Sequence, residues 1–94
     1  MSLNVAVIGC GAWGTNHVRV WQELGCLRVV CDLDPARLKT VQARYPHVEV
    51  SSDIRAVLGR PEIAAVVVAT PAPTHVSVVL QALEAGKDVL VEKP

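Results

Sequence analysis

Three glycines at positions 9, 11 and 14 follow a short apolar run and have the spacing G-x-G-x-x-G. In such a turn the first glycine permits the tight bend, the second lets the backbone approach a pyrophosphate, and the third lets the next helix pack closely on the strand. That helix has no Ser, Thr, Asp or Asn at the expected cap, so its first N–H groups lack a side-chain acceptor, which a pyrophosphate would supply. We therefore expect the turn to bind phosphate through Gly9, Gly11, Ala12, Trp13 and Gly14. A glycine turn capped by water is the alternative.

An acid, Asp32, ends the second apolar run, eighteen positions after Gly14. This is close to the distance at which an acid binds the ribose hydroxyls of a dinucleotide. Its charge would repel the 2′-phosphate of NADP, and Leu33 stands where a 2′-phosphate binder would carry arginine, so NAD is favoured over NADP. Arg37, one helical turn further on, keeps NADP as the less favoured alternative. The other interpretation of Asp32, a turn-forming acid, is weakened because Asp34 already fills the capping role.

A segment stiffened by two prolines follows the apolar run at residues 64–69. In a doubly wound sheet this segment borders the crevice at the switch point of the strand order, where ligands bind. We expect it to line a cofactor through Thr70, Pro71, Pro73 and His75. The alternative is a rigid turn in which Thr74 caps the next helix.

Glu92 and Lys93 follow the last apolar run, at the same carboxyl edge of the expected sheet. Ligands of parallel sheets bind at this edge, so we assign both residues to the cofactor site. A solvated lysine is the alternative for Lys93.

The three cysteines, Cys10, Cys26 and Cys31, show no C-x-x-C spacing. Cys10 lies in the glycine turn, where a helix N-terminus would lower the pKa of its thiol, but we favour a packing role over redox chemistry. No group of His, Cys and acidic residues has metal-ligand spacing, so no metal is expected. No secretory signal precedes the first apolar run, and we therefore expect a reducing cytoplasm.

Continuous apolar runs predict buried strands over residues 5–8, 27–31, 64–69 and 89–91, with a weaker strand over 48–50. Runs that do not alternate are typical of a parallel sheet that is covered on both faces. The helical segments between them are short enough to require right-handed crossovers. The sequence therefore predicts an α/β fold, a doubly wound parallel sheet of Rossmann type with strand order 3-2-1-4-5. We expect residues 1–94 to be an incomplete dinucleotide-binding domain, truncated before the sixth strand, and the amino-terminal part of a longer protein.

Apolar stripes at helical spacing lie between the strands. Their members are Val18, Trp21 and Leu24, then Leu38, Val41 and Tyr45, then Ile54, Val57 and Leu58, then Val76, Val79, Leu80 and Leu83. Asp34 before Pro35 predicts a helix N-cap, and Ser52 is expected to cap the helix that holds Ile54. The glycines just past three of the stripes are expected in the left-handed conformation that ends a helix. They are Gly25, Gly59 and Gly86.

Charge and hydropathy exclude several classes of protein. Lysine plus arginine number nine and aspartate plus glutamate number nine, so the net charge of zero gives no reason to expect nucleic acid or an anionic membrane as partner. Hydrophobic residues make up 51% of the chain and eighteen residues are valine, which is typical of a folded chain with a buried core. The longest apolar run, residues 63–69, is far shorter than the roughly 20 residues that cross a bilayer.

Four features together resemble the amino-terminal domain of the Gfo/Idh/MocA oxidoreductases. They are the glycine turn at positions 9–14, Asp32, the segment from Ala69 and Thr70 to His75, and the sequence Glu92-Lys93-Pro94. The glycine turn is common to many nucleotide-binding folds, whereas T-P…H followed by E-K-P after the next strand is specific to this family. The resemblance covers essentially the whole chain from Val5. It implies an NAD(P)-dependent oxidoreductase that moves hydride to or from a secondary alcohol carbon of a sugar, cyclitol or nucleotide sugar.

The resemblance also implies roles for single residues. In that family the acid matching Asp32 holds ribose, and the residue matching Lys93 lies near the nicotinamide ribose and the reacting hydroxyl, so Lys93 is the candidate catalytic residue. An ammonium there would polarise the hydroxyl and stabilise alkoxide character as hydride leaves. Family members place the acid/base histidine in a carboxyl-terminal domain that also builds the oligomer; nothing here matches that domain, and we expect the full-length protein to be a homo-oligomer. The run Trp13-Gly14-x-Asn16-His17-x-Arg19 is most similar to members that act on UDP-N-acetylamino sugars.

Two other classes stay open. A non-catalytic NAD-sensing or regulatory module would not need Lys93. A Rossmann domain for another nucleotide, such as coenzyme A, would not need Asp32 as a ribose clamp.

Overall fold

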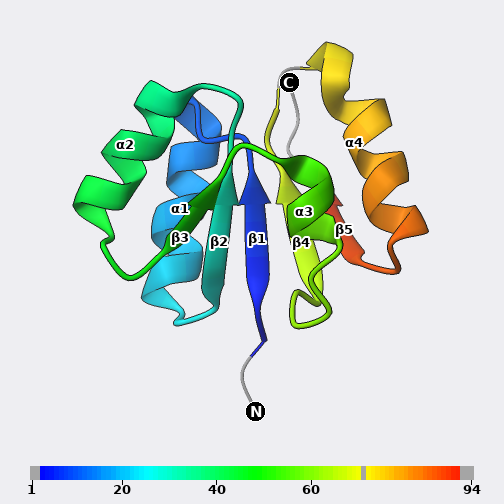
Figure 1. The fold of residues 1–94 in the computed structure, drawn as a ribbon, viewed down its shortest axis with the longest axis horizontal. Coiled ribbons are helices and arrows are strands. Elements are labelled where there is room, and N and C mark those ends of the chain that lie inside the picture. Colours follow the sequence, from blue (N-terminus) through cyan, green and yellow to red (C-terminus); the bar gives the residue numbers. More distant parts are fainter. Residues whose placement is uncertain (1–2, 71, 92–94) are drawn as a thin grey trace.

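Five parallel strands form one sheet in the order β3-β2-β1-β4-β5 in the computed structural model, which describes residues 3–70 and 72–91 (Figure 1). The strands are β1 (Val5–Ile8), β2 (Leu27–Cys31), β3 (Glu49–Ser51), β4 (Ala65–Val68) and β5 (Asp88–Val91). The helices are α1 (Ala12–Glu23), α2 (Pro35–Arg44), α3 (Ile54–Leu58) and α4 (Ala72–Glu84). The doubly wound fold and its strand order are therefore confirmed. Among the described residues, no helix is long and apolar enough to span a membrane.

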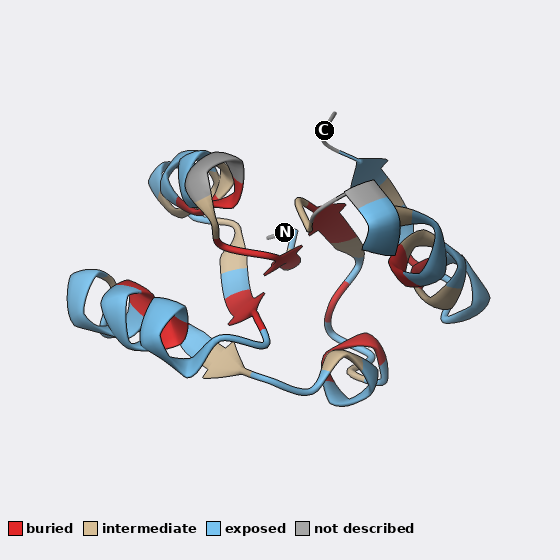
Figure 2. Ribbon diagram, turned by 90° about the horizontal axis from the view of Figure 1, so that it is seen from above, coloured by how far each residue is buried: buried red, intermediate tan, exposed pale blue. Residues whose placement is uncertain are grey.

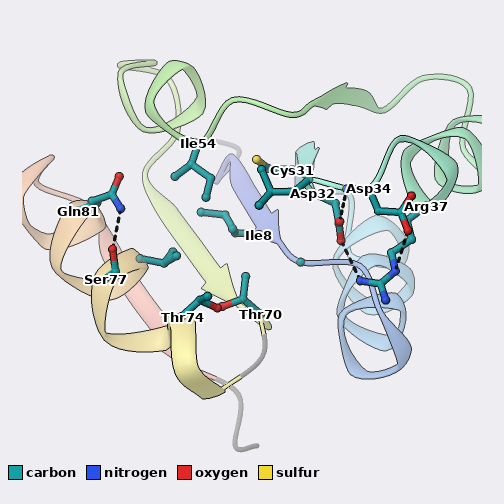
Figure 3. Close-up of a pocket in the computed structure, with 13 residues that line it drawn as sticks. Ile8, Cys31, Asp32, Asp34, Arg37, Ile54, Thr70, Thr74, Ser77 and Gln81 are labelled. Carbon is teal, nitrogen blue, oxygen red and sulfur yellow. Dashed lines mark hydrogen bonds and ion pairs between the residues drawn. The ribbon is translucent and has the colours of Figure 1, made fainter.

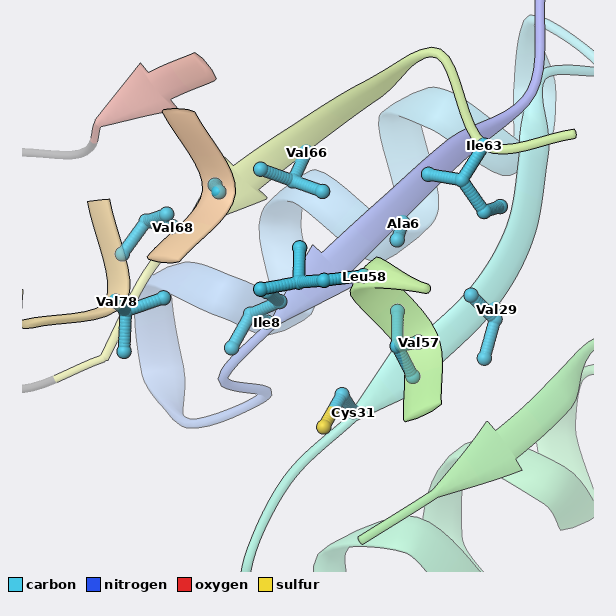
Figure 4. Close-up of a cluster of buried hydrophobic side chains, with 11 residues drawn as sticks. Ala6, Ile8, Val29, Cys31, Val57, Leu58, Ile63, Val66, Val68 and Val78 are labelled. Atoms are coloured by element: carbon cyan, nitrogen blue, oxygen red, sulfur yellow. The ribbon is translucent and has the colours of Figure 1, made fainter. Parts of the chain in front are cut away.

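Helices cover both faces of the sheet, with α1 and α2 on one face and α3 and α4 on the other (Figure 2). The side chains of β1 alternate between the two cores because successive residues of a strand point to opposite faces. Ala6 and Ile8 pack with residues of α3 and α4, whereas Val5 and Val7 pack with residues of α1 and α2. Figure 4 shows the first of these cores. Burial on both faces explains why the strands are continuous apolar runs.

Two predicted helix caps have different outcomes. The Asp34 cap is confirmed, because Asp34 Oδ1 accepts the Ala36 N–H at 2.9 Å and Pro35 is the first helical residue. The Ser52 cap is wrong, because α3 is capped by the next residue, Asp53, whose Oδ1 accepts the Ala56 N–H at 3.2 Å. A cap must stand directly before the first helical residue, and Asp53 occupies that position.

Two of the three predicted left-handed glycines are confirmed, with φ of +74° at Gly25 and +77° at Gly86. The prediction for Gly59 is wrong, since its φ is −78°. The chain leaves α3 through a tighter turn, in which Arg60 N–H donates to the carbonyl of Val57 at 3.2 Å. A turn of this kind continues the right-handed backbone and needs no left-handed residue.

The stripe predicted for α4 is wrong for three of its four residues, and the fourth, Val79, packs against the core. Val78 and Ala82 are buried against β4 and β5, whereas Val76, Leu80 and Leu83 are exposed. Apolar residues occupy a broad arc of α4 beside a polar stripe of Thr74, Ser77 and Gln81, so spacing alone fits more than one register.

Candidate functional site

A cavity of about 580 Å³ opens at the carboxyl ends of the central strands (Figure 3). It collects four predicted site residues, Gly9, Asp32, Leu33 and Thr70. It also includes side chains that sequence reasoning did not assign to a site: Ile8, Cys31, Ile54, Thr74, Ser77, Val78 and Gln81. These come from α3, α4 and the ends of β1 and β2, far apart along the chain. Only the topology of the sheet brings them together.

The glycine turn between β1 and α1 is too crowded for side chains at two positions. Gly9 has a φ of +95°, and a Cβ there would lie 2.8 Å from the carbonyl carbon of Ala69. A Cβ on Gly14 would lie 1.9 Å from the carbonyl oxygen of Gly9, so the helix packs directly on the turn. Gly9 and Gly14 therefore fix the close approach of helix, turn and strand that a phosphate-binding turn needs.

The first turn of α1 has backbone N–H groups that no carbonyl of its own helix can accept from. Gly11 is its N-cap and makes no side-chain cap hydrogen bond, as the sequence predicts. Ala12 and Trp13 begin the helix, which places their backbone N–H groups at its positive end. A bound phosphate would satisfy these N–H groups.

Asp32 connects the two turns that border the cavity. Its Oδ2 accepts the N–H of Cys10 at 2.8 Å, and its Oδ1 accepts the N–H of Asp34 at 2.8 Å. Burial by itself would raise the pKa of this carboxyl, but the two N–H groups, the Cys10 thiol and Arg37 together hold the pKa of Asp32 below its usual value. The side chain is almost completely buried and stays charged at neutral pH.

Arg37 lies beside Asp32 and is itself half exposed. Its guanidinium is 3.7 Å from Asp32 Oδ2 and 3.8 Å from Asp34 Oδ2. Arg37 also lies next to Gly11. A Cβ on Gly11 would lie 3.6 Å from the Arg37 guanidinium, an ordinary contact distance. The Arg37 guanidinium, the positive charge at this end of the cavity, thus forms ion pairs with two carboxylates.

Burial, followed by the charge of Asp32, raises the pKa of Cys10 to about 12. Burial and the same carboxylate raise the pKa of Cys31 to about 11. The expectation that a helix N-terminus lowers the pKa of Cys10 is therefore wrong, because the Cys10 thiol donates to Asp32 Oδ2 at 3.4 Å and a thiolate would face that carboxylate. A protonated, buried thiol fits the packing role.

The segment after β4 contributes two buried polar atoms. Thr70 Oγ1 and His75 Nε2 meet no hydrogen-bond partner within the described part of the chain, and Thr70 lines the cavity. A buried hydroxyl without a partner is costly, and a ligand hydroxyl or amide would satisfy it. Helix α4 begins at Ala72, so Thr74 is not its cap but lies in its first turn, where Pro73 is exposed.

Three predicted site residues, Pro71, Glu92 and Lys93, lie outside the described residues. Across residues 3–70 and 72–91, no three His, Cys, Asp or Glu side chains gather closely enough to hold a metal ion. The site therefore rests on a glycine turn, an uncapped helix, a charged carboxylate and an unpaired hydroxyl. This set fits a dinucleotide, whose pyrophosphate and ribose hydroxyls match those groups.

Comparison with known proteins agrees with the geometry. Residues 3–94 match the model of the family described as "Oxidoreductase family, NAD-binding Rossmann fold". The chain is 41% identical to an inositol 2-dehydrogenase of Acidothermus cellulolyticus over 96 residues and 43% identical to one of Rhodococcus erythropolis over 95 residues. These alignments cover 99% and 98% of the chain but only 28% of each relative.

Solved structures give the same fold. GenD2 from gentamicin A biosynthesis, in complex with NAD, superposes with a TM-score of 0.90 at 36% identity, covering 99% of this chain and 27% of that one. The WlbA dehydrogenase from Chromobacterium violaceum, in complex with NADH and UDP-GlcNAcA, gives a TM-score of 0.88 at 29% identity, covering 99% and 28%. The chain spans little more than a quarter of the length of these proteins.

The raised pKa values of Cys10 and Cys31 predict slow alkylation. Cys26 is half-buried, and its thiol donates to the carbonyl of Leu24 at 3.6 Å. With iodoacetamide at pH 8, we expect Cys26 to react at least about tenfold faster than the other two thiols, because the thiolate is the nucleophile. Mass spectrometry of the peptides measures the three rates. In urea all three should react alike. Fast alkylation of Cys10 in the folded protein would restore a redox role.

Proposed function

The chain belongs to the Gfo/Idh/MocA family of oxidoreductases, and on that premise we propose that it is the NAD-binding part of a dehydrogenase. The proposed reaction moves hydride between NAD and a secondary alcohol carbon of a sugar, cyclitol or nucleotide sugar. The observation that carries the proposal is the Asp32 carboxylate, charged and buried between the glycine turn and the cavity.

Asp32 retains acceptor capacity for a ribose. An ionised carboxylate offers about four lone-pair positions. The N–H groups of Cys10 and Asp34 take one position on each oxygen. Within residues 3–70 and 72–91, the further donor to Oδ2 at hydrogen-bond distance is the Cys10 thiol at 3.4 Å, a weak donor that a ribose hydroxyl outcompetes. Two ribose hydroxyls therefore find one acceptor each.

The charge at Asp32 also favours NAD over NADP. A 2′-phosphate would replace the ribose hydroxyl and place its charge against a buried carboxylate. Arg37 would attract that phosphate, but it is already paired with Asp32 and Asp34. Exposed Leu33 offers no further donor at the cavity wall.

Lys93 is the proposed catalytic residue of this part of the protein, on the basis of the E-K-P resemblance. When bound, the nicotinamide cofactor supplies the hydride chemistry. The Lys93 ammonium would polarise the reacting hydroxyl and stabilise the developing alkoxide. The proton acceptor and most of the substrate pocket would belong to the family's carboxyl-terminal domain, which would also build a homo-oligomer.

Two substrate classes are supported by different observations. The inositol 2-dehydrogenases, at 41% and 43% identity, favour a cyclitol. The Trp13-Gly14-x-Asn16-His17-x-Arg19 run favours a nucleotide sugar, and WlbA, a structural relative, is in complex with UDP-GlcNAcA. A non-catalytic NAD sensor is the second candidate function, and turnover by the wild-type full-length protein separates an enzyme from it.

The preference for NAD is tested by calorimetric titration of the full-length protein. We expect NADH to bind more tightly than NADPH. Asp32→Ala should weaken NADH binding by about 10- to 100-fold, because a hydrogen bond to a charged group contributes about 1.5–3 kcal/mol. The same change should reduce the difference in affinity between NADH and NADPH. Asp88→Ala, an exposed acid at the opposite edge of the sheet, is the control and should change neither affinity. A wild-type preference for NADPH would overturn the assignment.

The role of Lys93 is tested by steady-state kinetics with a cyclitol or nucleotide-sugar substrate. Lys93→Ala should lower kcat/KM by roughly 10²-fold or more, while the dissociation constant of NADH changes little. Lys39→Ala removes an exposed lysine from α2 and should leave both quantities unchanged. Unchanged turnover in Lys93→Ala would make Lys93 a solvated lysine, whereas absence of turnover in the wild-type protein with both substrate classes would favour the sensor.

A further inference from the structure

One wall of the cavity carries a polar pair that the proposed function does not use. Ser77 and Gln81 stand one turn apart on α4, and Gln81 Nε2 donates to Ser77 Oγ at 3.2 Å. Both residues line the same cavity as Asp32. Figure 3 shows the pair on one side of the cavity and Asp32 on the other, with Ile8 and Ile54 between them.

The cavity has the chemistry of a pocket for a flat aromatic base. Its middle is apolar, formed by Ile8 and Ile54 with Val78, and polar groups stand at its ends. Its volume of about 580 Å³ lies within the range of roughly 300–1,000 Å³ for ligand pockets. An apolar slot with a few polar groups at its edge binds a ring by its faces and identifies it by its edge.

The position of Asp32 determines which part of a dinucleotide enters this slot. Phosphates belong at the uncapped start of α1, and the ribose hydroxyls belong at Asp32. The base of the same nucleoside is attached to the other side of the ribose. With phosphate and ribose placed, the base would occupy the remaining space of the cavity, toward α4.

We infer that Ser77 and Gln81 recognise the amino edge of adenine in the bound dinucleotide. This inference rests on the proposed function. Because Gln81 Nε2 is engaged with Ser77 Oγ, the Gln81 Oε1 atom is presented as an acceptor. An acceptor suits the 6-amino group of adenine, which donates to the carboxamide oxygen when Asn or Gln binds this base. Ser77 acts as a positioning residue that holds the carboxamide in this orientation.

The same arrangement disfavours a 6-oxo base. Hypoxanthine has a carbonyl where adenine has its amino group, so two acceptors would face each other at Gln81 Oε1. To bind it, the Gln81 carboxamide has to turn over, and the Ser77 hydroxyl has to change from acceptor to donor. The structure therefore assigns the pair a role in specificity for adenine, in addition to affinity.

The test compares NADH with reduced nicotinamide hypoxanthine dinucleotide in calorimetric titrations of the full-length protein. We expect wild-type protein to bind NADH about five- to tenfold more tightly, the factor for one neutral hydrogen bond. Gln81→Leu should weaken NADH binding by that factor and leave the hypoxanthine analogue unchanged, so that the ratio falls to about one. Gln81→Glu keeps only acceptors and should retain the preference for NADH.

Ser77→Ala supplies the readout for positioning. It frees the carboxamide to turn over, so we expect the ratio to fall through tighter binding of the analogue, with NADH affinity nearly unchanged. Gln42→Leu, on the exposed face of α2, is the matched control and should change nothing. Equal binding of both dinucleotides by wild type, or no change in Gln81→Leu, overturns the inference and leaves the proposed function standing. Binding of neither dinucleotide overturns the proposed function itself.

Discussion

The carboxylate of Asp32 accepts one backbone N–H from each of the two turns that border the cavity. One donor, Cys10, belongs to the glycine turn after β1, and the other, Asp34, begins α2 after β2. Burial would favour the neutral acid, and the donors around it reverse that preference, which keeps the pKa of Asp32 low. The charged form is therefore what fixes the two turns relative to each other. A ribose that donates two hydroxyl hydrogen bonds would therefore bind a carboxylate that is already oriented.

The rest of the site depends on that fixed point. The glycine turn has no room for side chains at Gly9 and Gly14, so its backbone lies directly against β4 and α1. The uncapped start of α1 follows this turn, whose Gly9 lines the same cavity as Asp32. On the opposite face, α3 and α4 enclose a slot that ends at the Ser77–Gln81 pair. Phosphate, ribose and base thus each have a chemically distinct place along one edge of the sheet.

Much of this was predictable because it is encoded locally. The spacing of the glycines, the acid at the end of β2 and the continuous apolar strands each follow from short-range chemistry, and the strand order follows from short right-handed crossovers. The register of α4 was not predictable, because its apolar residues occupy a broad arc of the helix and fit several registers. The wall at Gln81 was not predictable either, since nothing near Gln81 in the sequence indicates that it lines the same cavity as Asp32. The raised pKa of Cys10 depends on another long-range contact, the approach of Cys10 to the Asp32 carboxylate, together with burial.

A crystal structure of the full-length protein with NADH tests the shared role of Asp32 most directly. We expect the carboxylate to accept both hydroxyls of the adenosine ribose while the N–H groups of Cys10 and Asp34 stay at hydrogen-bond distance from it. Ribose hydroxyls bound to another side chain, or a carboxylate turned away from the glycine turn, would contradict it.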